Sequence, residues 1–266
     1  MSSLKSLAPG SLTGKVALVT GSSRGIGAET IRQLAAAGAD VIVNYRDKAA
    51  RAEKLAAELA ATGTSAVALQ ADLTDYATVD AMVGRIAQRF GRLDILVLNA
   101  SGGMESGMGD DYALKLNRDA QVNVLTQGAE LMGPGGRVVF VTSHQAHFID
   151  TVPPMPEYEA VAKSKRAGEV ALRELIPQLA EKGIGFTVVS GDMIEGTITA
   201  TLLERAAPGA IDARKEAAGK LYNVSEFAAE VAHAAVDPVP ADNTRLALLT
   251  QVDALTGIAN RRAADE

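Results

Sequence analysis

The chain alternates short apolar runs with longer segments of helix-forming composition, and this alternation limits the folds open to it. Some runs, such as Ile95–Leu98 and Val138–Val141, are apolar at successive positions rather than at every second one. Such runs are typical of strands that are covered on both faces, as in parallel sheets. Parallel strands need crossover connections, which helices supply. The sequence therefore predicts an α/β fold with a parallel sheet between two layers of helices.

About seven strands and several crossover helices follow from this pattern. The predicted strands are Lys15–Thr20, Asp40–Asn44, Ser65–Gln70, Leu93–Asn99, Arg137–Ser143, Gly185–Ser190 and Arg245–Thr250. The clearest helical segments, rich in strong helix formers, are Ile26–Ala37, Lys48–Ala61, Asp75–Phe90 and Glu157–Glu181. Because no interior linker rich in Gly, Pro or Ser divides the chain, we expect a single domain over residues 1–266 in which residues 1–11 are an N-terminal tail.

Composition narrows the possible partners. With 32 acidic and 26 basic residues the net charge is −6, which favours neither a nucleic acid nor a membrane surface. The absence of cysteine excludes disulfides and thiolate chemistry, and three histidines leave little for a metal, so no metal site is predicted. No run has the length of a signal peptide or a membrane span. The expected location is the cytoplasm.

A glycine-rich turn, T-G-S-S-R-G-I-G at Thr20–Gly27, follows the first predicted strand and precedes a helix. Glycines permit positive φ angles and let a phosphate approach the bare backbone, while the helix N-terminus supplies oriented N–H donors. A strand–turn–helix–strand context is the one in which such a turn binds a dinucleotide. We therefore expect this turn to hold the phosphates of a dinucleotide cofactor.

The glycine spacing, G-x-x-x-G-x-G, resembles that of the main branch of the short-chain dehydrogenase/reductase family. Further matches occur in the family's order: A-D-L at Ala71–Leu73, N-A-S-G at Asn99–Gly102, Asn117, and G-G-R-V-V-F-V-T-S at Gly135–Ser143. The resemblance covers about residues 12–200. It implies a doubly wound Rossmann fold and a homo-oligomer, a tetramer or a dimer, built through the helices at Tyr112–Met132 and Glu157–Glu181.

The resemblance also implies which residues contact the cofactor. Asp72 matches the family aspartate that contacts the adenine, and Ser101 stands where a glycine is usual in the turn after the fourth strand. Past the sixth strand, Gly191 and Thr197 match the segment that contacts the nicotinamide carboxamide, and Ser190 stands where the family has a proline. The predicted cofactor-binding residues are Gly21, Ser23, Arg24, Gly25, Ile26, Gly27, Tyr45, Arg46, Asp72, Leu73, Asn99, Ala100, Ser101, Lys165, Gly191 and Thr197.

Charge at the end of the second strand indicates which nicotinamide dinucleotide is used. NAD enzymes usually place a carboxylate there for the ribose 2′-hydroxyl, whereas NADP enzymes place Arg or Lys to pair with the 2′-phosphate. This chain has Tyr45 where the family's Asp would fall, and Arg46 follows it. Arg24, inside the glycine turn, is a second basic candidate. NADP(H) is therefore predicted ahead of NAD(H).

The predicted catalytic residues are Ser143, Tyr158, Lys165 and Asn117. Family members reduce carbonyls or oxidise alcohols with Ser, Tyr and Lys, usually helped by an Asn, and the resemblance implies these roles for Ser143 and Asn117. The family spaces its Tyr and Lys as Y-x-x-x-K, but the residue four before Lys165 is Val161. The nearby tyrosine is Tyr158, seven residues before Lys165.

On a helix, two residues seven positions apart lie within ~20° of the same face. They are separated by ~10.5 Å along the helix axis, compared with ~6 Å for residues four positions apart. The Y-x6-K spacing is also that of the divergent enoyl-acyl-carrier-protein reductases. Three interpretations stay open. Tyr158 is the acid beside Lys165, or it has another role while a different group donates, or the site is catalytically weak. His144 and His147 are candidates for a substitute acid, because histidine titrates near neutrality.

Together these features predict an NADP(H)-dependent short-chain oxidoreductase, most simply a carbonyl (keto) reductase or alcohol dehydrogenase with a small-molecule substrate. The alternatives are an enoyl-thioester reductase, from the Y-x6-K spacing, and a non-catalytic NADP(H)-binding sensor, from Val161. Residues 196–222 are the expected substrate lid, and Leu202, Leu203 and Ile211 in it indicate a partly apolar pocket.

Overall fold

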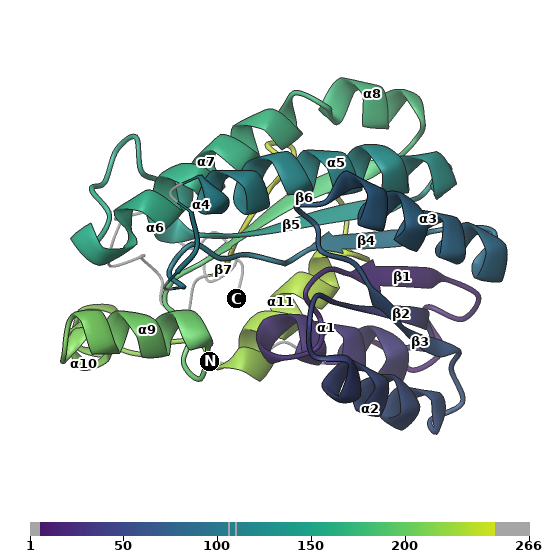
Figure 1. Ribbon diagram of the computed structural model, residues 1–266, viewed down its shortest axis with the longest axis horizontal. Coiled ribbons are helices and arrows are strands. Elements are labelled where there is room, and N and C mark those ends of the chain that lie inside the picture. The colour runs from purple at the N-terminus through teal and green to yellow at the C-terminus, as the bar shows by residue number, and fades with distance from the viewer. Residues whose placement is uncertain (1–5, 106, 110, 248–266) are drawn as a thin grey trace.

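The structure, a computed structural model, describes residues 6–105, 107–109 and 111–247 (Figure 1). The strands are β1 (Val16–Val19), β2 (Asp40–Tyr45), β3 (Ala66–Gln70), β4 (Ile95–Leu98), β5 (Arg137–Ser143), β6 (Gly185–Gly191) and β7 (Thr244–Ala247). The main helices are α1 (Gly25–Ala36), α2 (Ala49–Ala60), α3 (Tyr76–Phe90), α5 (Ala120–Gly128), α7 (Glu159–Arg173), α8 (Ile176–Glu181), α9 (Ile198–Ala206), α10 (Ala210–Ala218) and α11 (Val224–Ala234). The short helices are α4 (Tyr112–Leu114) and α6 (His144–His147).

Within the described residues the strands form one sheet in the order β3-β2-β1-β4-β5-β6-β7, and every pairing is parallel. The predicted fold class is therefore confirmed. The chain first winds outward from β1 to β3 and then starts again at β4 in the opposite direction. This places a switch point between β1 and β4, where ligands of open α/β sheets bind beyond the carboxyl ends of the strands.

Helices cover both faces of the sheet, with α1, α2 and α11 on one face and α3, α5, α7 and α8 on the other (Figure 1). Alternate residues of each strand pack into different cores. Ala17 and Val19 of β1 belong to the core under α1 and α11, whereas Val16 and Leu18 belong to the core under α3 and α5. Burial on both faces explains why the strands are apolar at successive positions.

Two predicted boundaries differ in detail. The segment predicted as one helix, Glu157–Glu181, divides into a 3₁₀ turn (Pro156–Tyr158), α7 and α8. Pro177 lies in the first turn of α8, where a missing N–H is tolerated but where it would interrupt a continuous helix. In the segment predicted as a tail, Leu7 packs against the core. Residues 248–250 of the last predicted strand lie outside the described residues.

The predicted lid consists of α9 and α10, which lie apart from both helical layers in Figure 1. Thr197 caps α9, because its hydroxyl accepts a hydrogen bond from the Ala200 N–H at 3.1 Å. A search of the described residues finds no helix that is long and apolar enough to cross a membrane.

Gly168 allows α7 to lie directly on the segment before α5. A Cβ at this position would overlap the carbonyl oxygen of Asn117. We therefore expect Gly168→Ala to lower the free energy of unfolding by about 1–3 kcal/mol, because the two segments must separate. Urea denaturation measures this. Gly84→Ala, on α3, is the matched control, since its Cβ would meet nothing within 4 Å and the substitution should stabilise by about 0.5–1 kcal/mol. Equal effects at both sites would contradict the packing argument.

Candidate active site

A cavity of about 630 Å³ opens at the carboxyl ends of the strands, beside the switch point. Every residue predicted to bind the cofactor, from Gly21 to Thr197, lines it. Ser143, Tyr158 and Lys165 line the same cavity, whereas Asn117 is not among the lining residues. The fold therefore brings residues that are far apart in the sequence into one place, and Asn117 is the single exception among the predicted site residues.

The glycine turn has the geometry that a phosphate needs. Gly21 and Gly25 have φ angles of +62° and +58°, which side-chain-bearing residues rarely adopt. A Cβ on Gly27 would lie 2.5 Å from Asn99 Nδ2 and 2.9 Å from Ser22 Cα, so only glycine lets α1 start this close to the strands. A Cβ added to Gly25 would meet nothing within 4 Å. The first turn of α1 thus presents its backbone N–H groups to open space.

The turns after β1 and β4 are joined by hydrogen bonds. The Thr20 hydroxyl accepts from the backbone N–H groups of Asn99 and Ala100, at 2.9 and 3.0 Å. The Asn99 side-chain amide in turn donates to the Thr20 carbonyl oxygen at 2.9 Å. Asn44, at the end of β2, accepts from the Gly21 N–H at 2.9 Å. This network holds three strand ends in fixed positions around the cavity.

Three arginines meet at the β2 side of the cavity. Arg51, on α2, donates to the Ser23 hydroxyl at 3.0 Å, and Arg46 donates to the Tyr112 hydroxyl at 2.6 Å. Burial, followed by the positive charge of Arg51, lowers the pKa of Arg24, the carboxylate of Glu105 opposes this, and the charge of Arg46 lowers the pKa further. Like charges held this close together favour an anion between them, and guanidinium groups suit phosphate. The cavity therefore fits a dinucleotide that carries a further phosphate at this end.

Tyr158 lies at the start of α7 with 5% of its surface exposed. Burial raises the pKa of its phenol, and a hydrogen bond with the Ser143 side chain partly offsets this rise. Ser143 ends β5, and its hydroxyl also accepts from the Ala146 N–H at 3.3 Å, which caps α6. The tyrosine that sequence spacing placed one turn away from the usual position thus still reaches the predicted serine, and it holds its proton at neutral pH.

Lys165 is 7% exposed, and its ammonium group contacts the Val141 carbonyl oxygen at 3.2 Å and the Ser101 hydroxyl at 3.4 Å. Burial lowers its pKa to about 8. Ser101, the residue that replaces a usual glycine, thereby serves as an acceptor for the lysine. These contacts hold the ammonium group beside the ends of β4 and β5.

Val161 occupies a packed position and is 4% exposed. It lines the cavity and faces Gly103, where a Cβ would lie 3.2 Å from Val161 Cγ2 and closer still to Ala113. The loop after β4 therefore lies against the position at which the family carries its tyrosine. A larger side chain at residue 161 would have to displace this loop.

Asn117 lies behind the cavity wall, in a π-helical turn (Lys115–Asp119) before α5. Its amide donates to the Gly102 carbonyl oxygen at 2.8 Å and to the Ser164 hydroxyl at 2.9 Å. Its side-chain oxygen accepts from the Gly102 N–H at 3.3 Å. Asn117 thus joins the loop after β4 to α7, so its contacts position the cavity wall.

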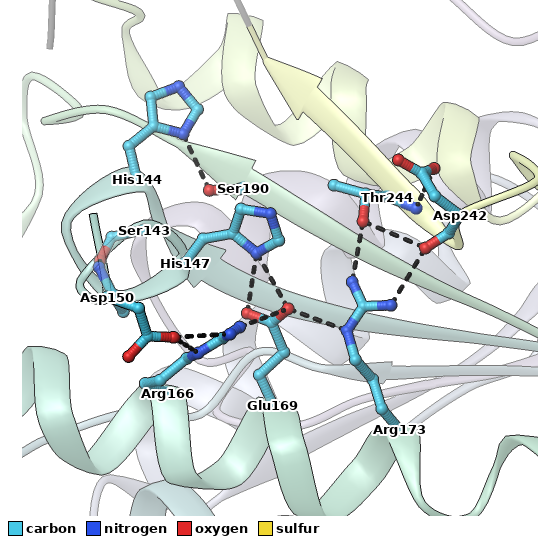
Figure 2. A network of polar contacts seen from close by, with 11 residues as sticks. Ser143, His144, His147, Asp150, Arg166, Glu169, Arg173, Ser190, Asp242 and Thr244 are labelled. Atoms are coloured by element: carbon cyan, nitrogen blue, oxygen red, sulfur yellow. Dashed lines mark hydrogen bonds and ion pairs between the residues drawn. The ribbon is translucent and has the colours of Figure 1, made fainter. Parts of the chain in front are cut away.

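The two histidines considered as substitute acids do not line the cavity. His144 Nδ1 lies 2.8 Å from the hydroxyl of Ser190, the residue that replaces a family proline. His147 Nδ1 lies 2.9 Å from both carboxylate oxygens of Glu169, a buried residue of α7 that also accepts from Arg173 (Figure 2). Both rings are therefore engaged in contacts that fix α6 against its neighbours.

Sequence reasoning missed several residues that line the cavity, namely Arg51, Met104, Gln145, Asp192 and Met193. For Arg51 a signal existed, since it is a basic residue in the first turn of the helix that follows Arg46. Met104, Asp192 and Met193 lie in loops and Gln145 lies in the short helix α6, and no local pattern identifies them because their positions depend on tertiary contacts.

A glycine turn at the switch point of a doubly wound parallel sheet defines a dinucleotide-binding α/β protein. A family model described as short chain dehydrogenase matches residues 15–207. The chain therefore belongs to the short-chain dehydrogenase/reductase family, whose members are oxidoreductases acting on carbonyl or alcohol groups. The resemblance inferred from the motifs is confirmed.

Individual relatives are similar over most of their length. A hydroxynaphthalene reductase of Aspergillus fumigatus is 34% identical over 204 residues, 74% of this chain and 73% of its own. A short-chain dehydrogenase of Burkholderia cenocepacia, solved in complex with NADP, has a TM-score of 0.76 at 32% identity and covers 90% of this chain and 97% of its own. The landomycin C-6 ketoreductase LanV, solved with NADP and rabelomycin, has a TM-score of 0.69 at 27% identity, with coverages of 86% and 91%.

The buried ammonium of Lys165 should reduce stability. Because burial lowers its pKa from 10.5 to about 8, the unfolded chain binds this proton more tightly, and the free energy of unfolding rises as pH rises from about 8 to 10.5. We expect Lys165→Met to stabilise the protein at pH 7 by up to about 3 kcal/mol and to lose this advantage near pH 10.5. Urea denaturation across this pH range measures it.

The control for this prediction is Lys163→Met, which removes an exposed lysine of α7 that pairs with Glu159. It should change stability little at any pH. A Lys165→Met protein that is less stable than the wild type at pH 7 would contradict the burial argument.

Proposed function

We propose that the protein is an NADPH-dependent ketoreductase in which Tyr158 donates the proton. The observation that supports this most directly is that Tyr158, Ser143 and Lys165 line the same cavity as the glycine turn. A phenol is protonated at neutral pH in any case, and the rise in pKa caused by burial makes Tyr158 a weaker acid, so the proposal rests on the place of Tyr158 in the cavity and not on its pKa.

NADP(H) is proposed as the cofactor on the charge of the β2 end. Arg24, Arg46 and Arg51 would hold the 2′-phosphate, and the first turn of α1 would hold the diphosphate. The structures of relatives solved with NADP support the same choice. When bound, the nicotinamide supplies the hydride.

The remaining steps belong to residues of the chain. Ser143 would donate its hydroxyl hydrogen to the substrate carbonyl oxygen, and Tyr158 would transfer its proton to that oxygen as negative charge develops there. Lys165 would hold the ribose of the cofactor from its position at the ends of β4 and β5. Asn117 is proposed as a positioning residue, because its contacts reach Gly102 and Ser164 rather than the cavity.

The chemistry of the walls supports an apolar substrate. The apolar end of the cavity, around Tyr158, is formed by Met104, Val161, Met193 and Leu203, which belong to one apolar cluster, and Leu202 also lines the cavity. Methionine and aliphatic side chains adapt to flat or irregular apolar bodies. The relatives named for hydroxynaphthalene and landomycin chemistry act on ring systems of this kind. We therefore propose a cyclic or polycyclic ketone as the substrate class.

One further proposal rests on family analogy. A homotetramer would form through the outer faces of α5 and α7, and light scattering that gives a monomer would refute it.

Removing the phenolic hydroxyl tests the proposed acid. Tyr158→Phe should lower kcat for reduction of 1-tetralone by NADPH at least ~100-fold while leaving the dissociation constant for NADPH unchanged. The measurement is NADPH oxidation followed by absorbance. Tyr76→Phe is the control, because Tyr76 is 59% exposed and lies on α3.

The same assay separates the alternatives. Turnover of enoyl thioesters but not of ketones would favour enoyl reduction. Tight NADPH binding without turnover of any ketone or enoyl thioester would favour a sensor. A wild-type enzyme whose activity survives Tyr158→Phe would require another proton donor.

Arg51 tests the proposed cofactor preference. Because a guanidinium–phosphate pair is a strong charge-assisted interaction, Arg51→Gln should raise the KM for NADPH about tenfold and change the KM for NADH less than about twofold. Steady-state kinetics with both cofactors measure this. Arg32→Gln is the matched control, since Arg32 is an exposed arginine of α1 that pairs with Glu58. An equal rise in KM for NADPH and for NADH would show that Arg51 does not bind the 2′-phosphate.

A further inference from the structure

The wall of the cavity carries a carboxylate at its apolar end. Asp192 directly follows β6 and lines the cavity beside Met193 and Ile194. Its side chain is only 12% exposed. A carboxylate this deeply placed among apolar side chains is unfavourable unless a cation compensates it.

Arg214, on α10, supplies that compensation. Its Nε lies 2.9 Å from each carboxylate oxygen of Asp192, and its Nη2 lies 2.6 Å from Oδ2. The Arg214 side chain is 15% exposed and is not among the residues that line the cavity. Of the two residues, Asp192 is therefore the one on the cavity wall, and its carboxylate is held by Arg214 and by the Met193 N–H, which donates to Oδ1 at 2.7 Å.

The pair is unlike the other ion pair of α10. Lys215 contacts Glu195 at 2.6 Å, but these side chains are 41% and 36% exposed, and such pairs contribute little. A pair that is largely removed from water gives little net stability over apolar residues of the same volume, yet removal of one partner leaves a costly charge. The position of Asp192 on the cavity wall gives this pair a role beyond the attachment of α10.

We propose that Asp192 and Arg214 are specificity-determining residues that make the cavity select uncharged ketones. Arg214 cancels the charge that Asp192 would otherwise present to the substrate, and each residue alone would favour substrates of the opposite charge. This inference rests on the proposed ketoreductase function and adds that the ketone substrate carries no net charge.

The two single variants should act with opposite signs. In Arg214→Gln the unpaired carboxylate should disfavour anionic substrates and favour cationic ones. In Asp192→Asn the unpaired guanidinium should do the reverse. Because charges in a partly buried site are incompletely screened, the change in relative kcat/KM should be on the order of tenfold.

The experiment compares three ketones with one ring system: 1-tetralone, a carboxylate-bearing 1-tetralone and an aminomethyl-bearing 1-tetralone. We expect the wild type to prefer 1-tetralone and the single variants to shift the two charged ketones in opposite directions. The double variant Asp192→Asn/Arg214→Gln should discriminate least between the three. Lys215→Gln and Glu195→Gln are matched controls on the exposed pair and should leave the ranking unchanged.

A purely structural pair predicts a different result. If both single variants change kcat/KM for all three ketones by the same factor, or leave the ranking unchanged, the proposal is wrong. If the wild type reduces none of the ketones, the proposed function fails instead. Calorimetric titration of the NADPH-bound protein with the same three compounds then tests the pair by itself, since opposite shifts in affinity support it and parallel shifts overturn it.

Discussion

The cavity depends on how closely β1 and β4 end beside each other. Thr20 joins the two turns, because its hydroxyl accepts from the N–H groups of Asn99 and Ala100 and its carbonyl accepts from the Asn99 amide. The absence of a side chain at Gly27 lets α1 start against this network. The backbone that faces a phosphate is thus fixed by the same contacts that fix the switch point of the sheet, so the cofactor site and the fold share one set of interactions.

Departures from the family motifs are accompanied by contacts that use the new side chain. Ser101, in place of a glycine, accepts a hydrogen bond from Lys165, and Ser190, in place of a proline, pairs with the buried His144. Val161, in place of the tyrosine, packs against the loop at Gly103. Reversion of Ser101 or Ser190 would remove these hydrogen bonds, whereas a larger side chain at residue 161 would have to move the loop at Gly103 or enter the cavity.

The sequence was informative wherever one strand or one turn decides the structure. The successive apolar residues of Ile95–Leu98 predicted a strand buried on both faces, and the glycine spacing predicted the phosphate turn. What the sequence left open depends on contacts between distant segments. The place of Tyr158 relative to Ser143 depends on how α7 lies across β5, and the pairing of Asp192 with Arg214 depends on how α10 returns to the end of β6. The spacing of residues along a helix predicts which of them share a face, but it does not predict which segment packs against that face.

Burial of two ionisable groups in one cavity also limits the conditions under which the site is complete. Burial raises the pKa of Tyr158 and lowers that of Lys165 to about 8, so as pH rises the lysine loses its proton first. Below that pH the free protein holds both a phenol that can donate and an ammonium that can attract the cofactor. Burial disfavours the phenolate of Tyr158, which carbonyl reduction forms and alcohol oxidation consumes, so desolvation sets no preferred direction of the reaction.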